Sequence, residues 1–231
     1  MTPTRVDILG EDYFLIFHSG TDAEASLHSF DGVTVSLTPS LTEDFCVRPY
    51  FHGRELRTDK AAAVAAAAHL TLVRGLPLSD FDFETPHGTD RVFHTGNGIF
   101  ALTIQRCKVL FTTTAEICGC RIRYTDVLLD RVYRVVHAES LSFVDKEVLM
   151  PLVSKGRYLP EAVLFTSVES GVISILPYTD FNPEPPSRLM LFCAAAFSYR
   201  GKERGLSACG GRLTAEIGSS TVNLNVKCEI K

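Results

Sequence analysis

The segment from His52 to Gly75, HGRELRTDKAAAVAAAAHLTLVRG, constrains the fold more than any other part of the chain. Its middle, Ala61–Ala68, holds seven alanines and one valine. Alanine is the strongest helix former, and its small side chain lets neighbouring elements approach a helix closely. Because this segment is apolar on all sides, we expect it to be buried. The sequence therefore predicts a thin central helix over residues 59–75, with other elements wrapped around it.

The two ends of this predicted helix carry residues that satisfy free backbone groups. Thr58 or Asp59 can cap the start by accepting a hydrogen bond from a free N–H group, and Gly75 follows Arg74 at the end. One interpretation of Asp59 is therefore a plain cap that contributes about 1 kcal/mol to stability.

Segments typical of β-strands lie on both sides of this helix. Arg5–Phe17 predicts an opening strand, and Phe81–Thr85 alternates apolar and polar residues as a half-buried strand does. A second helix, with an apolar body and an Arg-Gly ending, is predicted over residues 187–200. The repeated order of strands, helix and strands indicates an internal pseudo-repeat. We predict an α+β fold of two lobes, 1–112 and 113–231, each a strongly curved, mostly antiparallel sheet around one helix.

Two connecting segments complete this outline. Phe143–Lys155 has apolar residues at helical spacing, and Pro151 would kink or end that helix. Pro177–Pro186 is rich in proline, which predicts a loop.

Composition and charge exclude several classes of function. The net charge is −4, and no basic run is long enough to suggest a nucleic-acid or anionic membrane surface. No apolar run reaches the about 18 residues of a transmembrane helix, and the first seven residues lack the apolar core of a signal peptide. The seven cysteines are odd in number and scattered, which fits reduced thiols in the cytoplasm. Cys118 and Cys120 have no second ligand pair nearby, so we expect no metal site. No Gly-rich phosphate loop is present, and we expect no other cofactor.

The first helix segment resembles that of diaminopimelate epimerases. Those enzymes carry a segment close to DGSEVEMCGNGARCAAAYLLERG, in which a catalytic cysteine stands at the start of a buried helix. HGREL matches DGSEV without a gap, Asp59 takes the position of the catalytic cysteine, and both segments end on Arg-Gly. The opening strand resembles HGLGNDFVVID, with Glu11 in place of a substrate-binding asparagine. Near residue 160, YLPE resembles the family's LFPE, and a second substrate-binding asparagine falls on Leu164.

The chain is therefore similar to the diaminopimelate epimerase-like superfamily, which includes the phenazine-biosynthesis isomerases. In epimerases of this type, two cysteines, one at each helix start, remove and return the α-proton. This sequence lacks both: Asp59 replaces the first, and the second position falls near Arg188. Cys193 lies in the body of the second helix, where we expect a buried thiol. The resemblance thus implies a divergent member that is not a two-cysteine amino-acid racemase.

Two carboxylates remain as candidate catalytic groups. Asp59 stands at the first helix start, and Glu184, followed by Pro185, stands just before the second, where it resembles an Asp-Pro of the phenazine isomerases. Burial in a partly apolar cleft raises the pKa of a carboxyl group and suits it to proton transfer, whereas a helix N-terminus lowers that pKa. Glu184 can equally be an exposed loop residue. Both possibilities stay open for each carboxylate.

Five residues near the helix starts are candidate substrate-binding groups. Arg57, Lys60 and Arg188 could hold an anionic ligand together with free N–H groups, and we expect Lys60 or Arg188 to pair with one of the two carboxylates. Glu11 occupies the position of the epimerase asparagine, and Tyr178 could line the cleft. Each also has an ordinary interpretation, as a solvated side chain or, for the tyrosine, as part of the core.

These residues predict an isomerase-like enzyme that moves a proton or a double bond on a small metabolite between the lobes, without a cofactor. Asp59 and Glu184 would act as acid and base. The alternatives are a non-catalytic binding protein with the same fold and a cyclase that uses the shape of the cleft. The expected partner is a small-molecule ligand; a homodimer is compatible with the sequence, and neither nucleic acid nor a membrane is expected.

Overall fold

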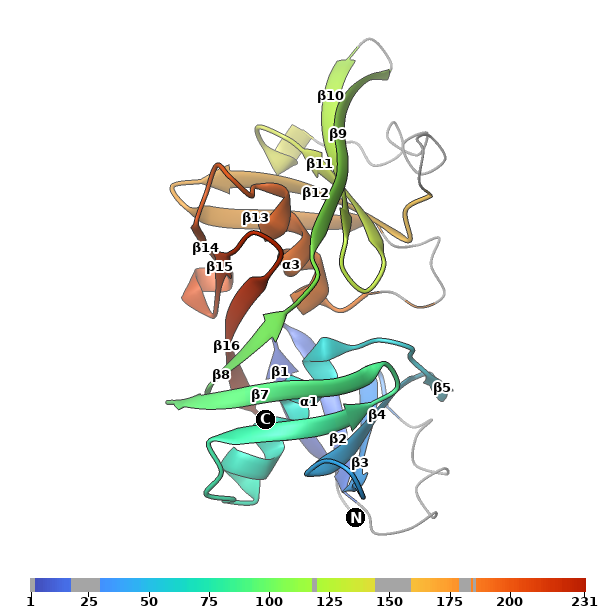
Figure 1. Cartoon of the computed structure of the whole chain (residues 1–231), viewed down its shortest axis with the longest axis vertical. Helices are drawn as coiled ribbons and strands as arrows, with labels where there is room; N and C mark the ends of the chain where they lie inside the picture. Colours follow the sequence, from blue (N-terminus) through green and yellow to red (C-terminus); the bar gives the residue numbers. More distant parts are fainter. Residues whose placement is uncertain (1–2, 18–29, 118–119, 144–158, 179–183, 185) are drawn as a thin grey trace. The chain divides into compact units, whose positions relative to one another are not determined.

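The computed structural model describes residues 3–17, 30–117, 120–143, 159–178, 184 and 186–231. Its contacts divide the chain into two compact units (Figure 1). The first unit contains Met1–Leu102, Ser187–Met190 and Asn225–Lys231, and the second contains Thr103–Pro186 and Leu191–Leu224. The sequence analysis placed one boundary after residue 112. Each unit instead combines segments that are distant in sequence. A single boundary in the sequence therefore cannot separate the two units.

The first unit is a closed sheet around the helix α1 (Lys60–Ala68). The strands follow one another in the order β1 (Thr4–Ile8), β2 (Glu11–Phe17), β3 (Val33–Pro39), β4 (Phe45–Phe51), β6 (Asp80–Thr85), β7 (Gly88–Gly96), β8 (Ile99–Ile104) and β16 (Val222–Ile230). Strand β16 also pairs with β1 in antiparallel orientation, which closes the ring. The short β5 (Arg54–Glu55) pairs only with β4. Because α1 contacts β1, β2, β3, β4, β6 and β7, the helix lies inside the ring (Figure 1).

The burial of α1 confirms the prediction made from its alanines. All eight residues of Ala61–Ala68 are 0% exposed. The strands around the helix direct large side chains toward it at alternate positions, such as Tyr13 and Leu15 on β2 and Phe81 and Phe83 on β6. Large side chains on the strands therefore fill the space that the small side chains of the helix leave.

Both ends of α1 follow from local chemistry. Asp59 caps the start, as the sequence predicted, and Gly75 adopts φ +68° beyond the end. Between them the helix is α-helical only to Ala68 and then widens into the π-helical turn η2 (His69–Val73). The predicted helix over residues 59–75 is thus confirmed, with a wider last turn that the sequence did not indicate.

The opening strand predicted over Arg5–Phe17 is wrong in one respect. It is an antiparallel hairpin, β1 and β2, with Leu9 and Gly10 at the turn. Both residues have positive φ, 57° and 84°, a region that glycine enters at little cost. Gly10 is therefore a turn residue rather than a strand residue.

The second unit is built from the remaining strands. Their order is β9 (Lys108–Ile117), β10 (Cys120–Leu128), β11 (Val132–His137), β12 (Ala162–Glu169), β13 (Val172–Tyr178), β14 (Gly205–Ala208), β15 (Leu213–Ile217) and then β16. Tyr124, Val136, Val163 and Phe165 form a core cluster in this sheet. Two 3₁₀ turns, η3 (Leu141–Phe143) and η5 (Cys209–Gly211), lie in its connections.

The second predicted helix is present as α3 (Arg188–Ser198). Cys193 is a buried residue of its body, as expected. The predicted loop over residues 177–186 begins later than expected, because Pro177 and Tyr178 end strand β13. The helix predicted over Phe143–Lys155 falls almost entirely outside the described residues.

The order of parallel and antiparallel strand pairs is the same in the two units, which is the pseudo-repeat. From β1 to β7 the successive pairings are antiparallel, parallel, antiparallel, parallel and antiparallel. The same series runs from β10 to β15. In each unit the second parallel pair, β4–β6 or β13–β14, is joined by a crossover that carries the helix, α1 or α3. The predicted α+β fold of two repeated, mostly antiparallel sheets, each with one helix, is confirmed. No helix in the described part of the chain is long and apolar enough to cross a bilayer.

Enlarging one alanine of α1 should destabilise the protein. We expect Ala65→Leu to lower the free energy of unfolding by about 1–3 kcal/mol, because the enclosing strands leave no room for three more carbon atoms. Urea denaturation measures this change. The matched control is Val73→Leu at an exposed position of the adjoining π-helical turn, which should change stability by less than about 0.5 kcal/mol. Equal effects of the two substitutions would contradict the tight enclosure of α1.

Candidate functional site

Asp59 is the residue around which the candidate site is built. It precedes α1 with extended backbone angles, φ −149° and ψ 93°. Its Oδ1 accepts a hydrogen bond from the backbone N–H of Ala61 at 2.9 Å, and its carbonyl oxygen accepts from that of Ala62 at 3.1 Å. The residue is only 4% exposed. Asp59 therefore fulfils the capping interpretation, and it does so out of contact with bulk water.

Burial decides the protonation behaviour of this carboxyl group. Desolvation, followed by the nearby charge of Glu11, raises the pKa of Asp59 to about 7. The N–H groups of Ala61 and Ala62 and the hydroxyl of Ser187 lower the pKa, but they do not compensate. The sequence suggested two opposing effects on the pKa of Asp59. Desolvation raises this pKa by more than the helix N-terminus lowers it. The carboxyl group thus exchanges its proton near neutral pH.

Strand β2 brings two further polar side chains to Asp59. Glu11 and Tyr13 lie two positions apart, so they share a face of the strand, and the Tyr13 hydroxyl donates to Glu11 Oε2 at 3.3 Å. Tyr13 is completely buried; burial first, and then the charges of Asp59 and Glu11, raise the pKa of its hydroxyl well above the usual value. Burial also raises the pKa of Glu11, against the opposing effect of Arg188.

The start of α3 supplies the remaining groups, within the first unit. The backbone N–H of Arg188 donates to Glu11 Oε2 at 2.9 Å, and its Nε lies 4.0 Å from Glu11 Oε1. Its Nη1 donates to the carbonyl oxygen of Leu9 at 3.0 Å, at the turn between β1 and β2. Ser187 is buried, and its hydroxyl is the group that lowers the pKa of Asp59. Glu11 therefore caps the first N–H of α3, and the residue before that helix acts on Asp59.

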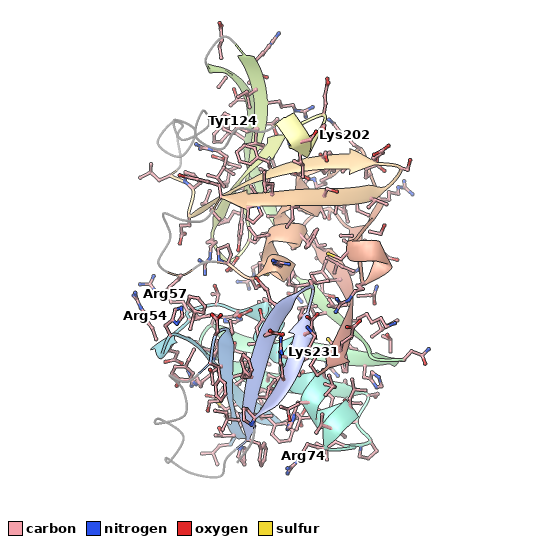
Figure 2. The ribbon with its side chains drawn as sticks, turned by 180° about the vertical axis from the view of Figure 1, so that it is seen from behind. Arg54, Arg57, Arg74, Tyr124, Lys202 and Lys231 are labelled. Atoms are coloured by element: carbon pink, nitrogen blue, oxygen red, sulfur yellow. The ribbon has the colours of Figure 1, made fainter. Side chains whose placement is uncertain are left out.

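The other predicted residues of the first unit lie apart from this group. Lys60 pairs with Asp90 of β7, whose carboxylate also contacts His87 Nε2 at 3.0 Å. Lys60 thus pairs with Asp90, which was neither of the two carboxylates considered for it from the sequence. Arg57 is exposed, close in sequence to Arg54 on the outer strand β5 (Figure 2).

Two predicted residues belong to the second unit and are described within it. The carbonyl oxygen of Glu184 accepts a hydrogen bond from Arg131 Nη1 at 2.8 Å. Tyr178 is half-buried and packs against the core cluster of Tyr124, Val136, Val163 and Phe165. This packing favours the core interpretation of Tyr178. The shared cavity expected for Asp59 and Glu184 stays a prediction.

Tyr13 and Ser187 were missed by the sequence analysis. Tyr13 follows Glu11 at the spacing of one strand face, and Ser187 is a typical helix-capping residue directly before α3, so weak signals were present. In the described part of the chain, no three His, Cys, Asp or Glu side chains converge as a metal site. The group of Asp59, Glu11, Tyr13 and Ser187 can instead hold and exchange protons, because two carboxyl groups and two hydroxyls belong to it and Glu11 alone among them is partly exposed.

Comparison with known proteins places this arrangement in a structural context. No protein-family profile matches the chain, and no curated protein is similar to it in sequence. Solved structures are similar over the whole length. A protein from Clostridium difficile (strain 630), classed as a phenazine-biosynthesis PhzC/PhzF protein, has a TM-score of 0.73 and 12% identity, with 99% of this chain and 96% of that chain covered.

Two further solved structures are similar to this chain in the same way. A probable proline racemase from Agrobacterium radiobacter K84 has a TM-score of 0.68 and 13% identity, over 98% of this chain and 90% of that chain. A hydroxyproline epimerase from Agrobacterium vitis has a TM-score of 0.64 and 12% identity, over 99% and 90%. The chain therefore has the fold of the diaminopimelate epimerase-like superfamily, as the sequence resemblance predicted.

The raised pKa of Asp59 should make stability depend on pH. A carboxyl group whose pKa is higher in the folded than in the unfolded state stabilises the fold below its unfolded pKa, and this stabilisation is lost as pH rises through its folded pKa. An asparagine side chain at this position cannot ionise. We therefore expect Asp59→Asn to gain stability relative to the wild type by about 1.4 kcal/mol per pH unit between about pH 4 and pH 7.

Denaturation in urea at a series of pH values measures this difference. The matched control is Glu55→Gln, which removes an exposed carboxylate from β5 and should leave the difference flat. If the Asp59→Asn difference were also flat across this range, the carboxyl group would be ionised at its ordinary pKa and the desolvation argument would fail.

Proposed function

We propose that the protein is a cofactor-independent isomerase in which the Asp59 carboxyl group transfers a proton on a small metabolite. The observation that carries the proposal is a buried carboxyl group whose pKa lies at about 7. General acid–base catalysis is most efficient when both protonation states are populated at the working pH. An ordinary surface aspartate, with a pKa near 4, would hold almost no proton at neutral pH.

The surrounding groups suit this role. In its ionised form, Asp59 would take a proton from a carbon atom of the substrate, and the electron pair would stay in the substrate as a delocalised anion. Return of the proton to another carbon, or to the opposite face of the same carbon, completes an isomerisation with no change in oxidation state. Glu11, in contact with Tyr13, is a second carboxyl group through which the proton could be returned.

Glu184 remains a second candidate for the returning group, because it stands directly before α3 in the sequence. The similar structures support an isomerase in general, since a racemase and an epimerase are among the proteins that share the fold. At 12–13% identity they do not indicate a substrate.

The test is proton exchange with solvent. The protein is incubated in deuterated water with a panel of small cyclic amino acids and amino-substituted unsaturated ring acids, and deuterium incorporation is followed by mass spectrometry. We expect Asp59→Asn to reduce exchange of the active compound by about 10²-fold or more, without lowering the melting temperature at neutral pH. Asparagine keeps much of the capping ability, so this change separates catalysis from folding.

Comparison of Glu11→Gln with Glu184→Gln identifies the second group, and Glu55→Gln is the control for loss of an unrelated carboxylate. Unchanged exchange in the Asp59, Glu11 and Glu184 variants would rule out carboxylate catalysis. Absence of exchange with every compound, together with ligand binding that survives Asp59→Asn, would favour the alternative of a non-catalytic binding protein.

A separate prediction concerns thiols. No cysteine stands at either helix start, and Cys193 of α3 is fully buried. We therefore expect that alkylation of the accessible thiols with iodoacetamide leaves proton exchange within about twofold of the untreated value. The exposed Cys209 provides the internal check that alkylation took place. Loss of exchange in proportion to alkylation would indicate a thiol mechanism and overturn this prediction.

A further inference from the structure

We propose that the second unit carries a binding site for a phosphate group, formed by Arg123, His137 and Tyr199 where α3 ends. The ligand is free phosphate or a phosphate monoester, which present the same tetrahedral, doubly charged group. None of these residues belongs to the group around Asp59, so the site extends beyond the proposed function.

Strand register places Arg123 and His137 side by side. They lie directly opposite each other in the antiparallel pair β10–β11, so their side chains project from the same face of the sheet, with Cβ atoms about 5 Å apart. The next strand continues this row, because Thr166 of β12 is the partner of His137 in the parallel pair β11–β12. Three neighbouring strands therefore hold an arginine, a histidine and a threonine in one row.

The residue that follows α3 packs against this row. The rings of His137 and Tyr199 meet edge to face, with centroids 5.1 Å apart and an interplanar angle of 89°. Both side chains are half-buried, whereas Arg123 is exposed. Nε2 of His137 lies 3.0 Å from Oγ1 of the buried Thr125, which holds the imidazole ring in place. Among the described residues, Nδ1 of the same ring has no hydrogen-bond partner.

The charges that act on His137 are positive. Burial first, and then the charges of Arg123 and Lys202, lower the pKa of His137 to about 4. Lys202 is exposed and lies on the turn after α3, where its backbone N–H donates to the carbonyl oxygen of Tyr199 at 2.9 Å. Within the described part of the chain, the side chains of Arg123 and Lys202 form no ion pair and no hydrogen bond. An anion is the group that would satisfy both charges.

Pairing with a carboxylate does not account for Arg123. Its partner on β9 is the uncharged Thr114, and Glu116 of the same strand lies opposite Arg121. The charges that shift the pKa of His137 include none from a carboxylate. Positive charge at this place is thus not balanced by the described residues of the unit.

Stabilisation of the helix end does not account for these cations either. The carboxyl end of a helix attracts positive charge through carbonyl groups that lack partners. At the end of α3 the chain bonds these groups itself. The carbonyl oxygen of Ala195 accepts from Ser198 Oγ at 2.6 Å, and those of Ala196 and Phe197 accept from backbone N–H groups three residues later, each at 3.0 Å. The two cations therefore remain available to a ligand.

A phosphate group suits the donors of this site better than a carboxylate does. The guanidinium of Arg123 can donate to two phosphate oxygens at once, and the ammonium group of Lys202 acts as a point charge on another. Burial raises the pKa of Tyr199, so its hydroxyl keeps a proton to donate. A bound anion would also favour the protonated form of His137, whose Nδ1 then becomes a donor. A tetrahedral group accepts from several directions, whereas the two oxygens of a carboxylate lie in one plane.

Calorimetric titration of the full chain with sodium phosphate, at pH 7 and constant ionic strength, tests the proposal. We expect a Kd of about 1 mM or tighter. Arg123→Gln should weaken binding by at least about tenfold, and Lys202→Gln and Tyr199→Phe by about threefold each. The matched control is Arg121→Gln, on the same strand and face but opposite Glu116, which should change the Kd by less than about twofold.

The protonation of His137 provides a second readout. Saturating phosphate should raise the pKa of its imidazole from about 4 towards the ordinary value of about 6.5, because a neighbouring anion favours the charged form. NMR titration of the histidine ring protons measures this pKa, and His137→Gln identifies the resonance. In Arg123→Gln, phosphate should no longer change the pKa of His137.

Glycerol 3-phosphate distinguishes the two sources of the phosphate group. Binding at least as tight as that of free phosphate assigns the site to a monoester, and weaker binding assigns it to free phosphate. The proposal is overturned if neither compound binds at about 10 mM, if sodium acetate binds as tightly as phosphate, or if Arg121→Gln weakens binding as much as Arg123→Gln. Circular dichroism of each variant checks that it is folded.

Discussion

The close enclosure of α1 by the strands of the first unit is the constraint on which the candidate site depends. Nothing larger than Val64 projects from Ala61–Ala68, so six strands contact a single helix. The first residue before such a helix lies inside the ring with it. Asp59 therefore loses its hydration for the same reason that the alanines are buried, and its raised pKa is a consequence of the architecture. Hydrogen bonds from the first turn of α1 lessen the free-energy cost of burying the ionised carboxylate without removing it.

The features predicted correctly from the sequence are those that local patterns determine. The alanine run, the capping residue and Gly75 act within a few residues of one another, and they identified α1 and its ends. The repeated order of strands and helix identified the two similar sheets. Pairing direction could not be read in this way, because the parallel pairs β2–β3 and β4–β6 depend on which strands the ring brings together. The turn at Leu9–Gly10 was missed because strand-like residues stand on both sides of it.

The site was predicted in part, for a similar reason. Asp59 was identified because a cap is a local feature. Its neighbours Tyr13 and Ser187 are far from it in sequence, and the hydrogen bond between Glu11 and Arg188 spans 177 positions. Lys60 was expected near the substrate because it adjoins Asp59, yet its partner Asp90 comes from β7, 30 residues away. Lys60 and Asp59 are neighbours in the sequence, but their side chains at the helix start contact different residues.

A carboxyl group at a helix start needs a different environment from a thiol to reach a pKa near neutrality. A free thiol has a pKa near 8.5, and a helix N-terminus moves it down toward neutrality, so a cysteine gains reactivity from the helix directly. An aspartate begins near 3.9, and the same helix moves it further from neutrality. Only strong desolvation and a nearby negative charge can bring it back, and Asp59 has both through its burial and through Glu11. The carboxylate of Glu11 is in turn held by the N–H of Arg188. A carboxyl group at this position thus reaches a pKa near neutrality through its burial first and through the charge of Glu11 second.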